Sequence, residues 1–247
     1  MSEDGSDNSR RNFLRSTLVA ISSAALPVGV RPLLGNEGRQ TTRQSESKSQ
    51  HFFTDSEKVF LKAAVDRLIP ADQHGPGAVE AGVVHYIDLQ MAGSWGRGEQ
   101  FYRHGPFKKG TPTQGYQLEY TPAELFRRSI SAIQTHFAGQ GTSFDKLTAD
   151  QKEAYLTSLE KGESDLNGVP SNTFFDFLWK HTVEGFFSDP IYGGNKNKAA
   201  WKMIGFPGAY ADYFNLVDKH GVEFHREPLS IGDAAVAHSM SSHEEGH

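Results

Sequence analysis

Residues 173–187 have the apolar pattern of an α-helix that is hydrophobic around nearly its whole circumference. At 100° per residue, its eight large apolar side chains point in almost every direction and leave one narrow polar strip. That strip consists of Thr173, Asp176, Lys180 and Glu184. A helix of this kind is either buried in a core or faces a partner on one side. The segment therefore predicts a helical fold around one central helix, and the core and interface interpretations can both hold.

Local signals predict further helices along the chain. The segments Thr54–Glu57 (TDSE) and Thr121–Glu124 (TPAE) are capping boxes, in which a threonine oxygen accepts the N3 amide and the glutamate reaches back. Apolar residues at helical spacing follow both boxes, and strand alternation is nearly absent. We expect helices from Thr54 to Pro70 and over 78–91, 121–137, 148–159, 197–204 and 209–220. A further helix, capped by Ser171 or Asn172, should run to about Phe187. The fold class expected is all-α, one compact helical domain with long loops.

Composition shifts divide the chain into four parts. We expect an export signal over 1–34, a flexible polar linker over 35–50, the helical domain over 51–228 and a polar tail over 229–247. Within the domain, 93–120 is rich in Gly and Pro and predicts a long loop.

The N-terminus matches the twin-arginine export pattern, with the sequence SRRNFLR at 9–15. The residues that carry the pattern are Arg10, Arg11, Phe13 and Leu14. The apolar run over 17–30 is too short and too diluted for a stable membrane span, so it favours a signal peptide. A chance Arg-Arg pair before an amphipathic helix is the alternative. We expect export by this route to the periplasm or the outer face of the cytoplasmic membrane.

Composition excludes several classes of function. The chain has no cysteine, which excludes disulfides, thiolate zinc sites, iron–sulfur clusters, c-type haem attachment and a cysteine nucleophile. Its net charge of -5 argues against a nucleic-acid partner. Its mean hydropathy of -0.53 excludes a polytopic membrane protein.

Two blocks resemble a known family. The sequence HTVEGFFSDPIYGGN at 181–195, followed by AWKMIGFPGA at 200–209, is similar to the signature of the gluconate 2-dehydrogenase subunit 3 family. The early segments 52–54 and 68–72 also resemble the start of that family, so the resemblance covers roughly 51–209. Its members are small exported subunits of membrane-bound sugar and sugar-acid dehydrogenases.

The resemblance implies that this chain carries no cofactor and no catalytic residue. It implies a separate large flavoprotein that binds FAD and oxidises the sugar, and a multihaem cytochrome c that passes electrons to quinone. The small subunit would support maturation and export, through the twin-arginine translocase, of a large subunit that has no signal of its own. The chain contains no dinucleotide fingerprint and no haem motif, which agrees with this division of labour.

The expected contacts with the partner lie in the family-like block. We expect Trp179, Tyr192 and Trp201 as anchors because Trp and Tyr often carry binding energy at interfaces, and the alternative for each is a place wholly in the core. The other interface candidates are His181, Glu184, Asp189, Gly193 and Gly194. The Gly-Gly turn could offer amides to an anion, but we favour a tight turn that docks Tyr192 onto the aromatic helix.

A rival hypothesis is a stand-alone exported helical enzyme or metal protein. His181 and Glu184 lie three residues apart on one helix, a spacing seen in ferritin-like metal sites. Glu184 and Asp189 could form a pair of catalytic carboxylates, but next to a rigid turn we favour capping and salt-bridge roles for them. A second copy of the metal motif is missing, so a buried or interfacial histidine is the favoured interpretation, and no metal is expected.

Overall fold

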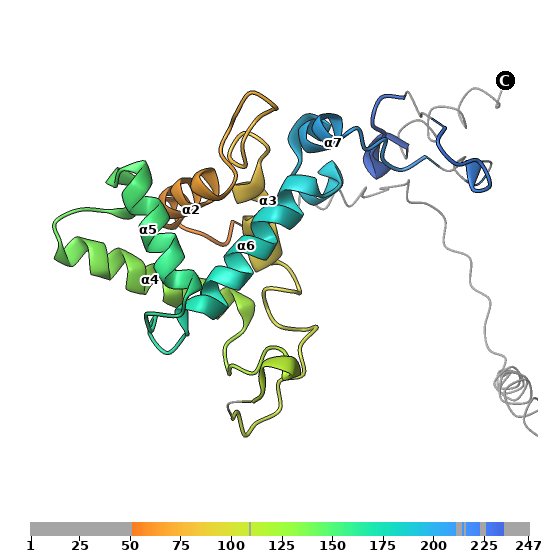
Figure 1. Ribbon diagram of the computed structural model, residues 1–247. Helices are drawn as coiled ribbons and strands as arrows, with labels where there is room; N and C mark the ends of the chain where they lie inside the picture. The colour runs from red at the N-terminus through yellow and green to blue at the C-terminus, as the bar shows by residue number, and fades with distance from the viewer. Residues whose placement is uncertain (1–50, 109, 211–213, 215, 223–225, 235–247) are drawn as a thin grey trace, which may run out of the picture. The chain divides into compact units, whose positions relative to one another are not determined.

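The computed structural model describes residues 51–108, 110–210, 214, 216–222 and 226–234 (Figure 1). The predicted signal and linker, with Arg10, Arg11, Phe13 and Leu14, lie outside the described residues. The described part is helical, as expected, and contains no β-strand beyond isolated bridges. None of its helices is long and apolar enough to cross a membrane.

Six α-helices, four 3-10 turns and a last helical stretch at 231–234 make up most of the described fold. The helices are α2 (Asp55–Leu68), α3 (Val83–Ala92), α4 (Pro122–Gly139), α5 (Ala149–Glu160), α6 (Ser171–Phe187) and α7 (Ala199–Ile204). The 3-10 turns are η1 (Pro112–Gln114), η2 (Phe144–Lys146), η3 (Pro190–Tyr192) and η4 (Lys196–Lys198). The predicted long loop is confirmed over 93–120, with η1 inside it.

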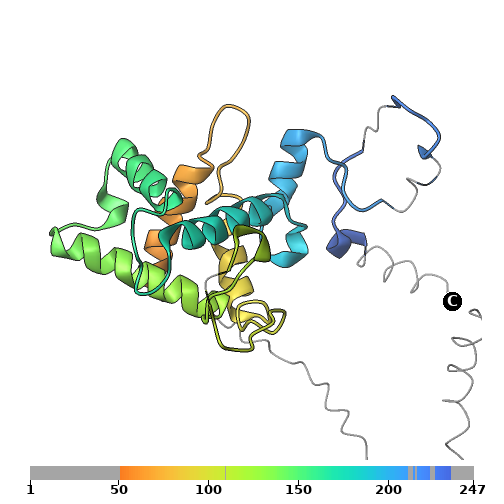
Figure 2. The ribbon, with the colours of Figure 1, turned by 60° about the horizontal axis from the view of Figure 1, so that its bottom comes forward.

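The helix α6 lies in the middle of the fold, as its apolar pattern requires. It packs against α2, α3, α4, α5 and α7, and Figures 1 and 2 show its N-terminal half beside α4 and α5 and its C-terminal end near α7. Phe174, Leu178 and Phe186 are fully or almost fully buried, and the Phe174 ring meets that of Phe126 in α4 edge-on at 5.5 Å. Trp179 remains 43% exposed, so α6 is both a core helix and a surface helix.

The predicted capping boxes begin their helices as expected. The Thr54 and Thr121 hydroxyls accept the amides of Glu57 and Glu124, whose carboxylates in turn accept the threonine amides. Thr148 begins α5 in the same way. Each cap contributes about 1 kcal/mol to stability.

Two predicted helices and one predicted cap differ from the structure. The helix expected over 78–91 begins only at Val83, because Gly82 takes the left-handed conformation (φ 81°). The cap of α6 is Pro170, because the Ser171 hydroxyl accepts the amide of Ser164 instead. The described residues of 209–220 form turns and short 3-10 pieces rather than an α-helix.

The carboxylate of Asp88 in α3 fixes the segment that leads into α2. This buried group accepts hydrogen bonds from the amides of Phe52 and Phe53, each at 2.8 Å. His51 Nδ1 lies 2.8 Å and Lys58 Nζ 3.1 Å from its other oxygen. Burial alone would raise the pKa of Asp88, but these hydrogen bonds outweigh it and hold the pKa below its usual value.

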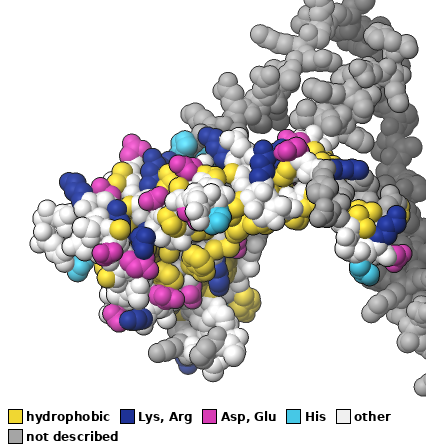
Figure 3. Space-filling model, turned by 45° about the horizontal axis from the view of Figure 1, so that its top comes forward, with side chains coloured by type: hydrophobic (Ala, Val, Ile, Leu, Met, Phe, Trp, Pro, Cys, Tyr) yellow, Lys and Arg dark blue, Asp and Glu magenta, His cyan; other side chains and the backbone are white. Residues whose placement is uncertain are grey.

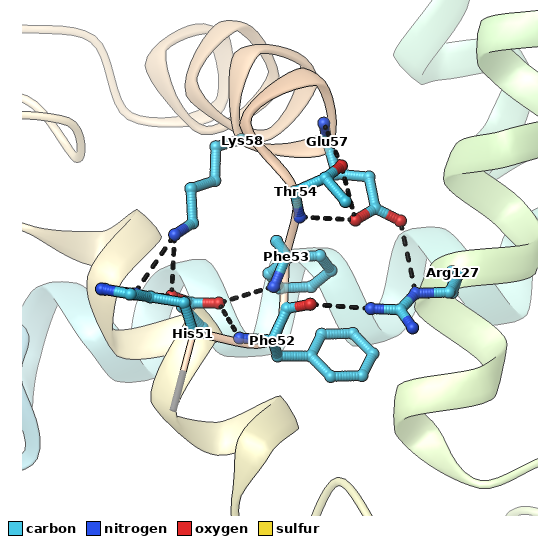
Figure 4. A network of polar contacts seen from close by, with 8 residues as sticks. His51, Phe52, Phe53, Thr54, Glu57, Lys58 and Arg127 are labelled. Atoms are coloured by element: carbon cyan, nitrogen blue, oxygen red, sulfur yellow. Dashed lines mark hydrogen bonds and ion pairs between the residues drawn. The ribbon is translucent and has the colours of Figure 1, made fainter. Parts of the chain in front are cut away.

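A second anchor joins the same segment to α4. The Arg127 guanidinium donates to the carbonyl of Phe52 at 2.7 Å, stacks over the Phe52 ring at 4.2 Å, and lies 3.5 Å from Glu57 (Figure 4). The segment that leads into α2 is therefore held on two sides.

Candidate docking surface

Exposed apolar side chains are concentrated towards the C-terminal end of the described chain. Of fourteen large hydrophobic side chains that are exposed in the described residues, ten lie between 187 and 231. Figure 3 shows hydrophobic side chains among the charged ones on one face. Six of the ten exposed side chains, from the end of α6 to just past α7, form what we call the docking surface. They are Phe187, Ile191, Tyr192, Met203, Ile204 and Phe206. The concentration of exposed apolar side chains in this part of the chain makes it a candidate interaction site.

Part of the docking surface lies on the turn Ser188–Asn195, which we call the docking turn. This turn packs tightly against two helices, α3 and α6. A Cβ at Gly194 would lie 2.0 Å from the carbonyl oxygen of Gly185, and one at Gly185 would lie 2.7 Å from the Tyr86 ring. Gly193 has a φ of 93° and lies close to the side chains of α3. Only glycine fits at these positions. A side chain at 193 or 194 would push the turn away from α3 and α6, and one at 185 would push α6 away from α3.

Asn195 holds the turn in place from inside. It is fully buried, and its backbone takes the left-handed conformation with φ 43°. Its Nδ2 donates to the carbonyl of Ser188 and its Oδ1 accepts the amide of Ala200, both at 2.9 Å. Its own amide donates to the carbonyl of Gly185. One side chain thus joins the end of α6 to the start of α7.

Asp189 closes the other side of the turn. Its Oδ1 accepts the amide of Ile191 at 3.0 Å and so caps η3, while its Oδ2 accepts the amide of Ile231 at 2.8 Å. Asp189 is buried, and both of its oxygens are engaged by backbone amides. This geometry gives Asp189 a structural role.

The turn presents two apolar side chains to solvent. Ile191 is 55% and Tyr192 53% exposed, although the backbone on either side of them is fixed. The expected tight turn is confirmed, but it contacts the helices through its glycines, and Tyr192 lies largely outside. Anchors on a rigid element lose little conformational entropy when they bind, which favours a role in recognition.

The other predicted interface residues divide into exposed and buried ones. Trp179 and Glu184 are exposed on α6, and Glu184 accepts a long hydrogen bond from Tyr86 at 3.4 Å. Trp201 is buried, and its indole N–H donates to the carbonyl of Phe187 at 2.7 Å. Its ring supports that of Phe206 edge-on at 5.1 Å. The expected direct anchor role of Trp201 is therefore replaced by support of an exposed neighbour.

His181 is buried among aromatic rings. The ring of Trp95 lies 4.3 Å away, and those of Phe126 and Phe177 lie within 6.3 Å. Burial lowers the pKa of His181, and the charge of Lys180 adds to this effect against the opposing influence of Glu184 and the Phe177 carbonyl. The imidazole is therefore neutral at pH 7, and its Nδ1–H donates to that carbonyl at 2.7 Å.

The groups of the rival hypothesis do not assemble into one site. The nitrogen Nδ1 of His181 and both oxygens of Asp189 are already bonded to backbone groups, and Glu184 lies towards solvent beside Tyr86. Among the residues that the structure describes, no three His, Asp or Glu side chains lie close enough together to hold a metal ion.

Sequence reasoning missed several members of the docking surface. Met203, Ile204 and Phe206 were expected only as part of a short helix and its end, and Ile191 as part of a turn. A usable signal was present, because α7 is only six residues long and cannot bury apolar residues on every side.

Comparison with known families matches residues 55–208 to the family described as gluconate 2-dehydrogenase subunit 3. The matched range includes α2 to α7 and the whole Ser188–Asn195 turn. No curated protein and no solved structure shows significant similarity to the chain.

Proposed function

Because the chain belongs to the gluconate 2-dehydrogenase subunit 3 family, we propose that it is the non-catalytic small subunit of an exported, flavin-dependent gluconate or sugar dehydrogenase complex. Membership in a family of numbered subunits implies that the chain works in a complex. The observation that carries the proposal is the rigid turn. Its glycines and Asn195 hold the backbone in place, while Ile191 and Tyr192 are exposed to solvent.

The proposed partner is the large subunit that binds FAD and oxidises the substrate. In this arrangement the present chain supplies contact surface, and a cytochrome c subunit takes up the electrons. The groups that would be the best candidates for chemistry in this chain, His181 and Asp189, serve the fold instead. That use of their hydrogen-bonding atoms supports a non-catalytic subunit.

The second part of the proposal is maturation and export. The leader carries Arg10 and Arg11 in a twin-arginine pattern, and that route moves proteins that are already folded. A large subunit without a leader of its own would cross the membrane bound to this chain. The complex would then act in the periplasm or at the outer face of the cytoplasmic membrane.

The docking surface by itself supplies only part of the binding energy such a partnership needs. Complete burial of an exposed apolar side chain contributes about 1.5–3 kcal/mol, so six side chains that are roughly half exposed contribute about 6 kcal/mol. Association costs roughly 4–15 kcal/mol in lost freedom. A stable complex therefore requires further contact area beyond these six residues.

Co-expression tests the proposal. The full chain, tagged at its C-terminus, should retain a flavoprotein subunit encoded beside it, with one FAD per complex and sugar-oxidising activity. Changing Arg10 and Arg11 to Lys should leave both proteins in the cytoplasm. The proposal fails if the flavoprotein is exported and active without this chain. It also fails if the chain alone oxidises substrate or binds a transition metal stoichiometrically, as the rival hypothesis requires.

A further inference from the structure

The chain leaves the family-like fold after α7 and returns to it twenty residues later. The amide of Ala209 donates to the carbonyl of Leu229 at 2.8 Å, and the amide of Leu229 donates to the carbonyl of Pro207 at 3.0 Å. Gly208 sits between them with a φ of 84°, and a Cβ there would lie 2.2 Å from the Leu229 carbonyl oxygen. We call the described residues between these two attachments, 209–210, 214, 216–222 and 226–228, the arm; they lie outside the matched family range.

A second attachment fixes the returning chain to the docking turn. Ser230 and Asp233 form a reciprocal cap, in which the Asp233 amide donates to Ser230 Oγ and the Ser230 amide donates to Asp233 Oδ2. Lys198 binds the same carboxylate at 2.7 Å. The amide of Ile231 is the group that donates to Asp189 at 2.8 Å. Asp189 thus connects the turn that carries Ile191 with the chain that closes the arm.

The described residues of the arm expose large apolar side chains despite these attachments. Phe214 is 75%, Val217 69% and Val222 53% exposed. An apolar side chain that stays in water loses the free energy that its burial would contribute. A loop that served only to connect two parts of the fold would therefore turn these side chains inward. A segment that is attached to the fold at both ends and exposes apolar side chains is typical of a binding loop.

We propose that the arm is a second contact element for the same large subunit, binding an apolar surface of that partner through Phe214, Val217 and Val222. The inference rests on the proposed function. Two observations commit it to that occupant. The hydrogen bond from Ile231 to Asp189 joins the chain directly after the arm to the turn that carries Ile191 and Tyr192, and the docking surface alone falls short of the contact that a stable complex needs.

The test compares two triple variants of the full chain, each co-expressed with the flavoprotein subunit. The arm variant carries Phe214→Ser, Val217→Ser and Val222→Ser. The matched control carries Val59→Ser, Tyr102→Ser and Phe107→Ser, which are also exposed but lie on α2 and the long loop. The arm variant should weaken binding to the flavoprotein at least about tenfold, while the control leaves it unchanged.

Trypsin supplies an independent readout. Lys219 is exposed in the arm, so cleavage after it should be fast in the isolated chain and slow in the complex. The inference is overturned if the arm variant binds like the control and Lys219 is cut equally fast in both forms. It is also overturned if the arm variant changes only the self-association of the isolated chain, which would make a second copy the occupant.

Failure of the inference is distinguishable from failure of the proposed function. If Ile191→Ser weakens binding and the arm variant does not, the proposed function stands and the arm has no part in it. If neither change affects binding, both proposals fall together.

Discussion

Replacing Asn195 by Ala and by Gly measures how the docking turn is held. Either change removes the bonds to the Ser188 carbonyl and the Ala200 amide, both made by a fully buried side chain. A buried polar group left without a partner costs about 1–3 kcal/mol, so the two losses together cost about 2–6 kcal/mol. Alanine pays about 1–2 kcal/mol more, because position 195 has a φ of 43° and only glycine adopts this conformation freely.

The comparison of the two variants isolates the backbone contribution. In ordinary helices and strands glycine is less stable than alanine by about 0.5–1 kcal/mol, so the predicted order at 195 is reversed. Urea unfolding of the purified chain, followed by tryptophan fluorescence, gives both free energies if the slope stays constant. The reasoning is refuted if Asn195→Ala costs less than about 1 kcal/mol, or if Asn195→Gly is the less stable variant.

Three further predictions concern stability. Gly185→Ala should lower the free energy of unfolding by about 1–3 kcal/mol, since its Cβ would overlap the Tyr86 ring, and urea denaturation checks this. The lowered pKa of Asp88 means that its carboxylate stabilises the fold above about pH 4 and that this contribution is lost as the pH falls further. Asp88→Asn should therefore be less stable than the unchanged chain at pH 7 and lose less stability in acid. An acid titration of stability that is the same for both chains would contradict this. Because the pKa of His181 is lowered in the folded chain, this histidine takes up a proton in the unfolded chain first as the pH falls below about 6.5, and stability should decline there. Thermal melts of His181→Phe should show a smaller decline over the same pH range.

Local signals in the sequence predicted most of the fold. The boxes at Thr54 and Thr121 fix helix starts with residues three apart, so they can be found without knowledge of the tertiary structure. The apolar pattern of 173–187 likewise predicted a helix that is mostly buried and partly exposed. The start of α3 was misjudged because apolar spacing over 78–91 gave no sign of the left-handed backbone at Gly82.

The candidate site was harder to predict because its geometry depends on distant contacts. Nothing near Asp189 in the sequence indicates that it binds the amide of Ile231, 42 residues away. The exposure of Ile191 and Tyr192 follows from the way Gly194 packs against Gly185, which only the assembled helices define. The sequence analysis pointed to this block and to Tyr192 within it, but the exposure of Ile191 could not be predicted from the sequence pattern.

The most direct test of the account is the affinity of the flavoprotein subunit for a chain that carries Ile191→Ser and Tyr192→Ser. Both side chains are about half exposed, so the fold should survive, and a Val59→Ser/Tyr102→Ser chain serves as the control. We predict a loss of about tenfold or more for the turn variant, which corresponds to about 1.4 kcal/mol, and no loss for the control. A folded turn variant that binds the flavoprotein as tightly as the control would contradict the account.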